Sequence, residues 1–354
     1  MSRQSIYYWK CDRPAAFHGT GEKREAGPDL ENQLRQAIAE VFPGQAITLA
    51  AAAGQGNHLT WNVDAGDTAL FARVEHGPEQ DQQLAIESAI MGLVAATGVP
   101  VPRIAAVDAT RLRVPFGWQL MERIPFPDLN HWFKEGSLDE PAIALRIGEA
   151  VATWQEIRPN GFGPFATEDT CYHARYDSYF SLRLEDHLHF LQDRNFIDPD
   201  RRREIASAIQ EHRSLLALDR ACLVHKDLAL WNILGSANHI AAYIDFDDAI
   251  GGDPMDDLSL LACFHDQAFL RNAFHGYTTI RPLPEEHRRR FWLHLLRNML
   301  VKAVIRVGAG YFERSDGFFL IRSGGSGADL RRMTHERIQL ALDGLATNAD
   351  LTIL

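Results

Sequence analysis

The sequence has little cysteine: Cys11, Cys171, Cys222 and Cys263 are the four thiols in 354 residues. They lie far apart and form neither a Cys-x-x-Cys pair nor a dense framework, which argues against a zinc ribbon or a secreted disulfide scaffold and favours reduced thiols. The sequence also lacks any run near the roughly 18 uninterrupted apolar residues that a membrane-spanning helix needs. Residues 1–25 mix aromatic, acidic and basic side chains and do not resemble a signal peptide. We therefore predict a cytoplasmic protein with no membrane partner.

Positive charge is scarce as well, because 36 Lys and Arg face 47 Asp and Glu, which gives a net charge of −11. This balance predicts no nucleic-acid partner, since phosphate contacts depend on an excess of basic residues. The pattern Gly-x-x-x-x-Gly-Lys-Ser/Thr is absent, which excludes a P-loop enzyme. What the sequence does have is apolar content, 46% of the chain. In a chain of 354 residues, this is more apolar content than one small hydrophobic core usually contains, which predicts two lobes.

Periodicity and turn residues divide the chain into an irregular N-terminal arm (1–27), an N-terminal lobe (28–124) and a helical C-terminal lobe (125–354). The boundary follows from Pro125 and Pro127, which prevent the strand before them from continuing. The N-terminal lobe is predicted to have helices over 28–41 and 78–97 and strands over 46–52, 58–63, 68–74, 103–107 and 118–122. The C-terminal lobe is predicted to have helices over 137–157, 179–192, 199–216 and 291–307, the first headed by a capping box from Ser137 to Glu140.

One part of the chain carries the chemistry: Val-His-Lys-Asp-Leu-Ala-Leu-Trp-Asn over 224–232, followed by Ile-Asp-Phe over 244–246. Asp227 can accept or orient the proton of an attacking hydroxyl, and Asn232 offers a neutral oxygen to a metal ion. Asp245 lies in an apolar strand, where a carboxylate is costly unless a cation such as Mg²⁺ meets it. We predict that His225 is a packing and hydrogen-bonding strut. The Asp257 carboxylate is predicted to bond to the backbone around the same loop.

These motifs resemble those of the aminoglycoside phosphotransferase and choline kinase superfamily, whose members are small-molecule kinases. Three family motifs match in the correct order at His225, Asp227, Asn232, Ile244, Asp245, Phe246, Asp253, Pro254, Asp257 and Leu258. The resemblance implies an α+β, bilobal, protein-kinase-like fold. In such a fold a small antiparallel β-sheet lobe with a helix binds the nucleotide, and a larger, mainly helical lobe carries the catalytic and metal-binding loops.

The resemblance also implies a nucleotide site in the N-terminal lobe. A glycine-containing hairpin over the phosphates is matched by Gly54, Gly56 and Asn57, although Gly-x-Gly-Asn is a common turn. Arg73 matches a basic residue that pairs with nucleotide phosphates, and Glu87 matches the acid that holds it. The alternative for this pair is a solvent-exposed strand charge and a helix-surface acid. The inter-lobe hinge, whose backbone meets adenine, is matched by Met121, Glu122 and Arg123.

Together these matches imply an ATP-dependent phosphotransferase that moves the γ-phosphate to a hydroxyl of a small molecule with the help of Mg²⁺. In this mechanism Asp227 orients the hydroxyl, and Asn232 and Asp245 bind the Mg²⁺. GTP is not excluded as the donor. The acceptor stays open between an aminoglycoside-like antibiotic, an amino alcohol and a sugar metabolite, and the oligomeric state stays open too. A cationic acceptor could be attracted by the acids Asp247, Asp248, Asp256 and Asp266.

Three alternatives compete with this mechanism. A catalytically silent, nucleotide-binding pseudokinase with a regulatory role would lack the base or the metal ligands, and all three are present. A protein kinase is disfavoured because Asp247 stands where such kinases have the Gly of Asp-Phe-Gly, and no Ala-Pro-Glu occurs. A metal hydrolase could use His187 and His189 with Asp247 and Asp248. The two histidines of His-x-His lie on different sides of the predicted helix, however, which predicts that both are surface residues.

Overall fold

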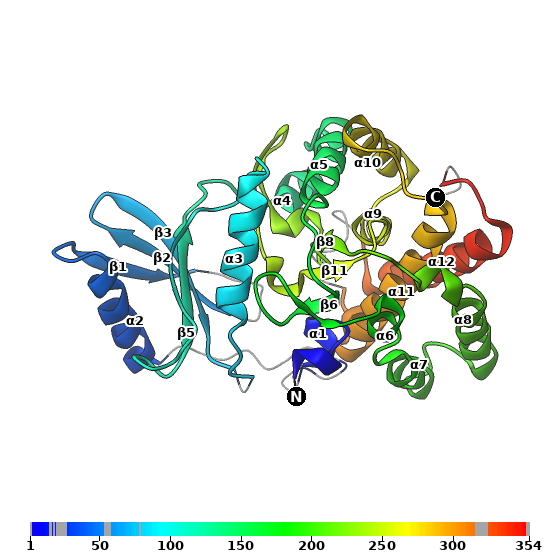
Figure 1. Cartoon of the computed structure of the whole chain (residues 1–354), viewed down its shortest axis with the longest axis horizontal. Coiled ribbons are helices and arrows are strands. Elements are labelled where there is room, and N and C mark those ends of the chain that lie inside the picture. The colour runs from blue at the N-terminus through cyan, green and yellow to red at the C-terminus, as the bar shows by residue number, and fades with distance from the viewer. Residues whose placement is uncertain are drawn as a thin grey trace.

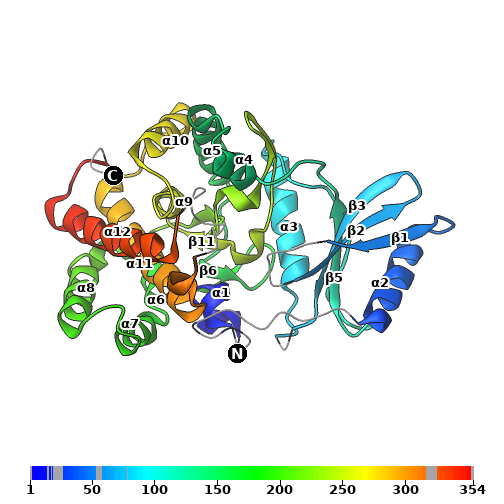
Figure 2. The same cartoon turned by 180° about the vertical axis from the view of Figure 1, so that it is seen from behind.

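The computed structural model describes residues 2–13, 16, 18, 27–52, 58–77, 79–315 and 325–351. The molecule has two lobes side by side, one built on a β-sheet and the other mainly helical (Figure 1, Figure 2). The first lobe contains α2 (Pro28–Val41), β1 (Ile47–Ala51), β2 (Leu59–Ala65), β3 (Thr68–Glu75), α3 (Gln83–Ala96), β4 (Ile104–Asp108) and β5 (Gly117–Glu122). The α+β, two-lobed fold predicted from the sequence is confirmed.

The five strands of the first lobe form one antiparallel sheet in the order β1-β2-β3-β5-β4. Alternate side chains along β2 and β3 point into the lobe, where Trp61, Val63 and Leu70 are buried. Helix α2 packs on the same core through Leu34 and Ile38. The first lobe therefore has a hydrophobic core of its own.

The second lobe contains α4 (Leu129–Glu135), α5 (Glu140–Trp154), β6 (Phe162–Phe165), β7 (Cys171–His173), α6 (Tyr176–Phe180), α7 (Leu184–Asp193), α8 (Pro199–Glu211), β8 (Cys222–Val224), β9 (Ile233–Ser236), β10 (His239–Tyr243), β11 (Ile250–Gly252), α9 (Asp256–Leu261), α10 (Gln267–Ile280), α11 (His287–Gly308) and α12 (Gly327–Thr347). Its central helix is α11, which is largely buried and contacts α7, α9 and α12. Strand β8 pairs with β11, so the loop after Val224 lies beside the loop before Ile250. This pairing brings the two sequence motifs together.

The predicted helices are wrong in several details. The helix expected over 199–216 ends as α8 at Glu211, and a separate 3₁₀ helix, η2 (Arg213–Leu216), follows it. The single helix expected over 179–192 is two helices, α6 and α7, because Arg183 between them has a left-handed backbone with φ 58°. The start of α5 is capped by Asp139 rather than by Ser137, since the Asp139 carboxylate accepts the N–H of Ala142 at 3.2 Å.

The described first part of the N-terminal arm, residues 2–13, has regular structure that the sequence did not predict. It contains a short 3₁₀ helix, η1 (Arg3–Ser5), and one helical turn, α1 (Trp9–Asp12). Tyr7, Tyr8 and Trp9 have exposed fractions of only 2%, 2% and 4%. Both views place α1 beside β6 and α11 (Figure 1, Figure 2), and Tyr7 and Tyr8 belong to the core of the helical lobe. Residues 6–12 of the arm are therefore a packed part of the second lobe.

Two further expectations concern thiols and membranes. All four cysteines are buried and free, as reduced thiols would be. Within the described part of the chain, no helix combines the length and the apolar character that a bilayer crossing requires.

Candidate active site

The loop that follows β8 is held by α9 and by the second motif. The Asp257 carboxylate accepts hydrogen bonds from the backbone N–H groups of His225 and Lys226, each at 3.0 Å. The His225 ring joins the two motif loops, because its Nε2 lies 3.0 Å from the carbonyl oxygen of Ile244 and its Nδ1 lies 3.3 Å from the N–H of Asp227. These contacts fix the direction in which the Asp227 side chain leaves the loop.

Asp227, Asn232 and Asp245 line one cavity of about 660 Å³ between the lobes. Asn232 donates from Nδ2 to Oδ2 of Asp227 at 3.0 Å and to its carbonyl oxygen at 2.8 Å. Asp245 has a left-handed backbone with φ 66°, and its side chain is 28% exposed. The structure therefore brings the three predicted side chains to one place.

Arg73 on β3 joins the two lobes at this cavity. Its Nη1 lies 2.6 Å from Oε1 of Glu87 on α3, and its Nη2 lies 3.0 Å from Oδ1 of Asp245. The alternative of a solvent-exposed pair is wrong, because Arg73 and Glu87 are 7% and 0% exposed. Burial raises the pKa of Glu87, and Arg73 opposes that rise. A fixed guanidinium therefore faces the same cavity as Asp245.

Three side chains that sequence reasoning missed surround the Asp227 carboxylate. Tyr8 donates from its hydroxyl to Oδ1 at 2.5 Å, and Nζ of Lys302 lies 3.1 Å from the same oxygen. Nζ of Lys10 donates to Oδ2. Burial alone would raise the pKa of Asp227, but Lys10 and Lys302 hold it well below its usual range. The carboxylate therefore stays ionised.

The sequence contains weak signals for these residues. Ile-Tyr-Tyr-Trp over 6–9 is an aromatic cluster in an otherwise polar arm, and Lys302 interrupts the apolar run over 291–307. An ammonium group in such a run needs a carboxylate partner. Neither signal identifies Asp227, because Tyr8 and Lys302 lie 219 and 75 residues from it in the chain.

The remaining predicted nucleotide residues fall into two groups. Met121, Glu122 and Arg123 line the cavity where β5 ends, and the N–H of Arg123 donates to the carbonyl oxygen of Ala69 at 3.3 Å. The hairpin residues Gly54, Gly56 and Asn57 lie outside the described residues. At the hinge, the described cavity wall is thus the end of β5 together with the residues that follow it, among them Ile124, Pro125 and Phe126.

The four acids considered as attractors of a cationic acceptor, Asp247, Asp248, Asp256 and Asp266, all have partners within the protein. Asp247 pairs with Arg3, and Asp248 accepts the backbone N–H of Trp9. Asp256 pairs with Lys226, and Asp266 accepts the backbone N–H of Phe269. Of the four, Asp247 alone is among the described residues that line the cavity. Burial, with neighbouring carboxylates, raises the pKa of Asp248 to about 7 although Lys10 opposes the rise. These acids therefore give no support to a cationic acceptor.

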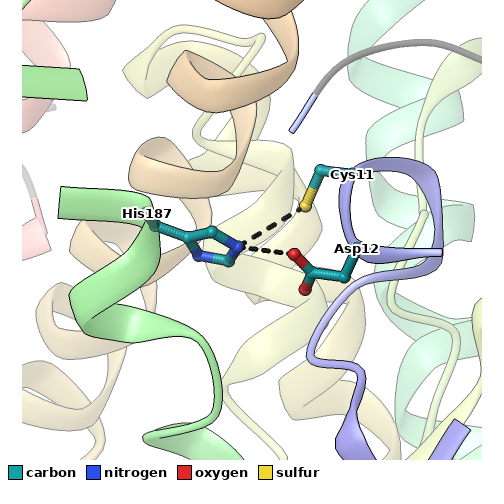
Figure 3. A group of neighbouring side chains, drawn as sticks. All are labelled: Cys11, Asp12 and His187. Atoms are coloured by element: carbon teal, nitrogen blue, oxygen red, sulfur yellow. Dashed lines mark hydrogen bonds and ion pairs between the residues drawn. The ribbon is translucent and has the colours of Figure 1, made fainter. Parts of the chain in front are cut away.

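Cys11, Asp12 and His187 form a buried cluster between the arm and α7 (Figure 3). Nε2 of His187 lies 2.8 Å from Oδ1 of Asp12 and 3.7 Å from Sγ of Cys11. Arg297 donates to Nδ1 of His187 at 3.0 Å, which leaves the ring proton on Nε2 and no lone pair there for a metal. Burial lowers the pKa of His187 to about 4, so the ring is neutral. We call this cluster the arm clamp, and its chemistry is that of a hydrogen-bonded contact.

The metal-hydrolase alternative fails on the positions of its histidines. His187 is buried in the arm clamp, whereas His189 is exposed and bonds back to the carbonyl oxygen of Glu185. The expectation that both histidines lie on the surface is therefore wrong for His187, because its side of α7 faces the arm.

A small antiparallel sheet beside a helical lobe, with two aspartates and an asparagine at the cavity between them, defines a kinase-like phosphotransferase of small molecules. The model of the phosphotransferase enzyme family matches residues 48–292. The chain belongs to that family, which confirms the resemblance seen in the sequence.

Solved structures with similar folds include other phosphotransferases. Aminoglycoside phosphotransferase APH(4)-Ia has a TM-score of 0.61 at 16% identity, covering 88% of this chain and 98% of that one. A putative fructosamine-3-kinase from Haemophilus somnus 129PT has a TM-score of 0.59 at 15% identity, covering 87% and 97%. Macrolide 2'-phosphotransferase MphH from Brachybacterium faecium has a TM-score of 0.53 at 16% identity, covering 79% and 93%. At these identities the likeness shows the fold. A search of the curated proteins found no match.

Proposed function

We propose that this protein transfers the γ-phosphate of ATP to a hydroxyl group of a small molecule. The observation that carries the proposal is the meeting of Asp227, Asn232 and Asp245 at the inter-lobe cavity beside Arg73. The similar structures support the donor, since thermostable mutants of APH(4)-Ia were solved as ternary complexes with hygromycin B and either ADP or AMP-PNP. GTP is kept as a second donor to be tested.

The oxygen atoms at the cavity suit Mg²⁺. The amide oxygen of Asn232 and the carboxylate of Asp245 are hard ligands of the kind that Mg²⁺ takes beside nucleotide phosphates, and Asp245 is partly exposed at the cavity. Asn232 and Asp245 would hold the ion. When bound, it supplies positive charge to the phosphates during transfer.

The side chains of this protein position the reactants around that site. Arg73, held by Glu87, presents its guanidinium to the phosphates, and Asp227 accepts the hydrogen bond of the acceptor hydroxyl and orients it for in-line attack. Against the effect of burial, Lys10 and Lys302 keep the pKa of Asp227 low. Asp227 therefore acts first by orientation and takes the proton as the new oxygen–phosphorus bond forms.

The cavity wall around Asp227 favours some acceptors over others. Trp231, Phe264, Lys302, Ile305 and Tyr311 are among the described residues that line the cavity, and Lys302 contacts Asp227. A polycationic aminoglycoside would meet two ammonium groups here, those of Lys10 and Lys302, which is unfavourable. Of the acceptors considered, we therefore propose a neutral one such as a sugar hydroxyl.

The test is a thermal-shift and ADP-release screen of the purified protein with Mg·ATP and Mg·GTP over sugars, amino alcohols, macrolides and aminoglycosides. For the acceptor found, Asp227→Asn is expected to lower kcat by about 10²- to 10⁴-fold, because Asn keeps the shape but cannot take the proton. Its affinity for Mg·AMP-PNP should stay within about threefold. The matched control is Asp219→Asn in an exposed loop, which should change neither quantity. Unchanged turnover in Asp227→Asn would refute the assignment.

A further inference from the structure

Lys10, on the N-terminal arm, lies between the two carboxylates that would flank a transferred phosphoryl group. Its Nζ donates to Oδ2 of Asp227 and lies 3.9 Å from Oδ2 of Asp245. The side chain lines the inter-lobe cavity and is 28% exposed. If Asp227 orients the attacking hydroxyl and Asp245 holds the metal on the phosphates, a cation between them faces the γ-phosphorus.

The backbone on both sides of Lys10 is fixed to the helical lobe. Before it, Tyr7 stacks on Tyr179 with 5.0 Å between ring centroids, and the Tyr179 hydroxyl donates to the carbonyl oxygen of Tyr7 at 2.8 Å. After it, Asp12 is held by His187 in the arm clamp (Figure 3). The position of Lys10 is therefore set by the arm and not by its own ion pairs alone.

Lys302 already balances the charge of Asp227. Its Nζ lies 3.1 Å from Oδ1 of Asp227 and 3.2 Å from the hydroxyl of Tyr8, and the side chain is buried. Asp245 in turn has Arg73 as its partner. Arg73 is shared between Asp245 and Glu87. Lys10 therefore brings a third positive charge to the site beside Lys302 and Arg73, and it does so on the cavity side, where an anionic group would be attracted.

We propose that Lys10 is a catalytic residue of the phosphoryl transfer, supplied to the active site by the N-terminal arm. This inference rests on the proposed function. In the reaction the acceptor oxygen forms a bond to the γ-phosphorus, the bond from that phosphorus to the β,γ-bridging oxygen breaks, and ADP leaves with the electron pair. The hydroxyl proton passes to Asp227. Lys10 keeps its own proton, donates hydrogen bonds to the non-bridging γ-oxygens and offsets the negative charge on them.

The protonation state of Lys10 agrees with this role. Burial would lower the pKa of its ammonium group, but Asp227 and Asp245 raise the pKa above its ordinary value. Lys10 is therefore a hydrogen-bond donor throughout the neutral range.

The experiment compares Lys10→Met and Lys10→Arg with the wild type and with a matched control, Lys134→Met. Lys134 lies on α4 and is not among the residues that line the cavity. Two measurements need no organic acceptor: phosphate release from Mg·ATP with water as the acceptor, and the calorimetric affinities for Mg·AMP-PNP and Mg·ADP.

We expect Lys10→Met to lower the rate of phosphate release by about 10²- to 10³-fold. Lys10→Met should weaken the affinity for Mg·AMP-PNP by about tenfold. The affinity for Mg·ADP, which has no γ-phosphate, should stay within about threefold of the wild-type value. Lys10→Arg should recover part of both losses.

Each outcome decides. A Lys10→Met protein with the wild-type rate and the wild-type ratio of the two affinities would overturn the role of Lys10. A Lys10→Met protein that releases phosphate faster than the wild type would overturn it too, because Lys10 would then block the active site rather than assist the reaction. If the wild type releases phosphate to water too slowly to measure, the ratio of the affinities for Mg·AMP-PNP and Mg·ADP still tests the role of Lys10. If the wild type binds neither nucleotide, the proposed function itself fails and this inference falls with it.

Discussion

At the residue scale, the site depends on how fully its charged groups are paired. Asp227 receives hydrogen bonds from four side chains: Tyr8, Lys10, Asn232 and Lys302. A carboxylate with so many donors is ionised and fixed in direction, which suits a group that orients a hydroxyl. The same donors make it a weak base in the ground state. Rate acceleration at this site must therefore come mainly from positioning and from charge placed around the phosphates.

The ion pair between Arg73 and Glu87 is the place to test charge placement on the nucleotide side. Glu87→Gln keeps an acceptor for Nη1 of Arg73, now 2.6 Å from Oε1, but removes the negative charge. We expect KM for ATP to rise by about tenfold, which corresponds to about 1.4 kcal/mol, with kcat changed by less than about threefold. Steady-state kinetics measure both parameters.

The control for Glu87 is Glu31→Gln on α2, in the same lobe. Glu31 pairs with Arg35 at 2.9 Å, but the two side chains are 36% and 40% exposed, so the pair contributes little and no kinetic parameter should change. A larger effect on kcat than on KM in Glu87→Gln would show that Arg73 acts on the transition state rather than on nucleotide binding.

At the element scale, strands and core helices were predictable because each carries its own periodicity. The meeting of Asp227 and Asn232 with Asp245 at one cavity was predictable for a similar reason, since the first two share one short motif and Asp245 follows closely. The arm was not predictable in this way. Tyr8 meets Lys302 at a separation of 294 residues, and Asp12 meets His187 at a separation of 175. A local pattern shows that such aromatic residues are apolar but not which surface they cover, so the arm's contribution to the site emerged only from the structure.

The arm clamp between α1 and α7 predicts a dependence of stability on pH. Burial lowers the pKa of His187 from 6.5 to about 4, so between these values the unfolded chain binds a proton that the folded chain does not. The stability that the neutral ring contributes is complete above the unfolded pKa and is lost as the pH falls through this window, by roughly 3 kcal/mol at most. His187→Gln keeps a donor toward Asp12 and should flatten this part of the curve, measured as the free energy of unfolding in urea at several pH values.

The neighbouring exposed residue gives the control for that measurement. His189→Gln should keep the full loss of stability on acidification, because His189 points into solvent from the same helix. If His187→Gln loses as much stability as the wild type on acidification, the titration of another group is responsible and the clamp is not the acid-sensitive contact.

At the scale of the whole molecule, the described residues form two separate hydrophobic cores. The small core contains Trp61 and Trp118, and the large core contains Trp292 and reaches into α3 through Met91. We keep residues 28–124 and 125–354 as the proposed lobes, with α3 in the large core through Ile90, Met91 and Val94 and in contact with β4 and β5 of the first lobe. A nucleotide held by residues of both lobes would therefore couple two units that are otherwise stabilised separately.

This coupling is measurable by hydrogen exchange, comparing amides of β2 and β3 with amides of α11. We expect the strands to exchange through a smaller opening free energy than α11, because the small lobe buries fewer residues in its core. Mg·AMP-PNP at about 100 times its dissociation constant should raise the opening free energy of the strands by about 2.7 kcal/mol, since opening the small lobe destroys the site. At the same ligand concentration, Glu87→Gln, with its tenfold weaker binding, should gain only about 1.4 kcal/mol. If the strands and α11 have equal opening free energies without ligand, the two cores unfold as one. If the opening free energy of the strands does not rise when the ligand is added, the nucleotide does not bind between the cores.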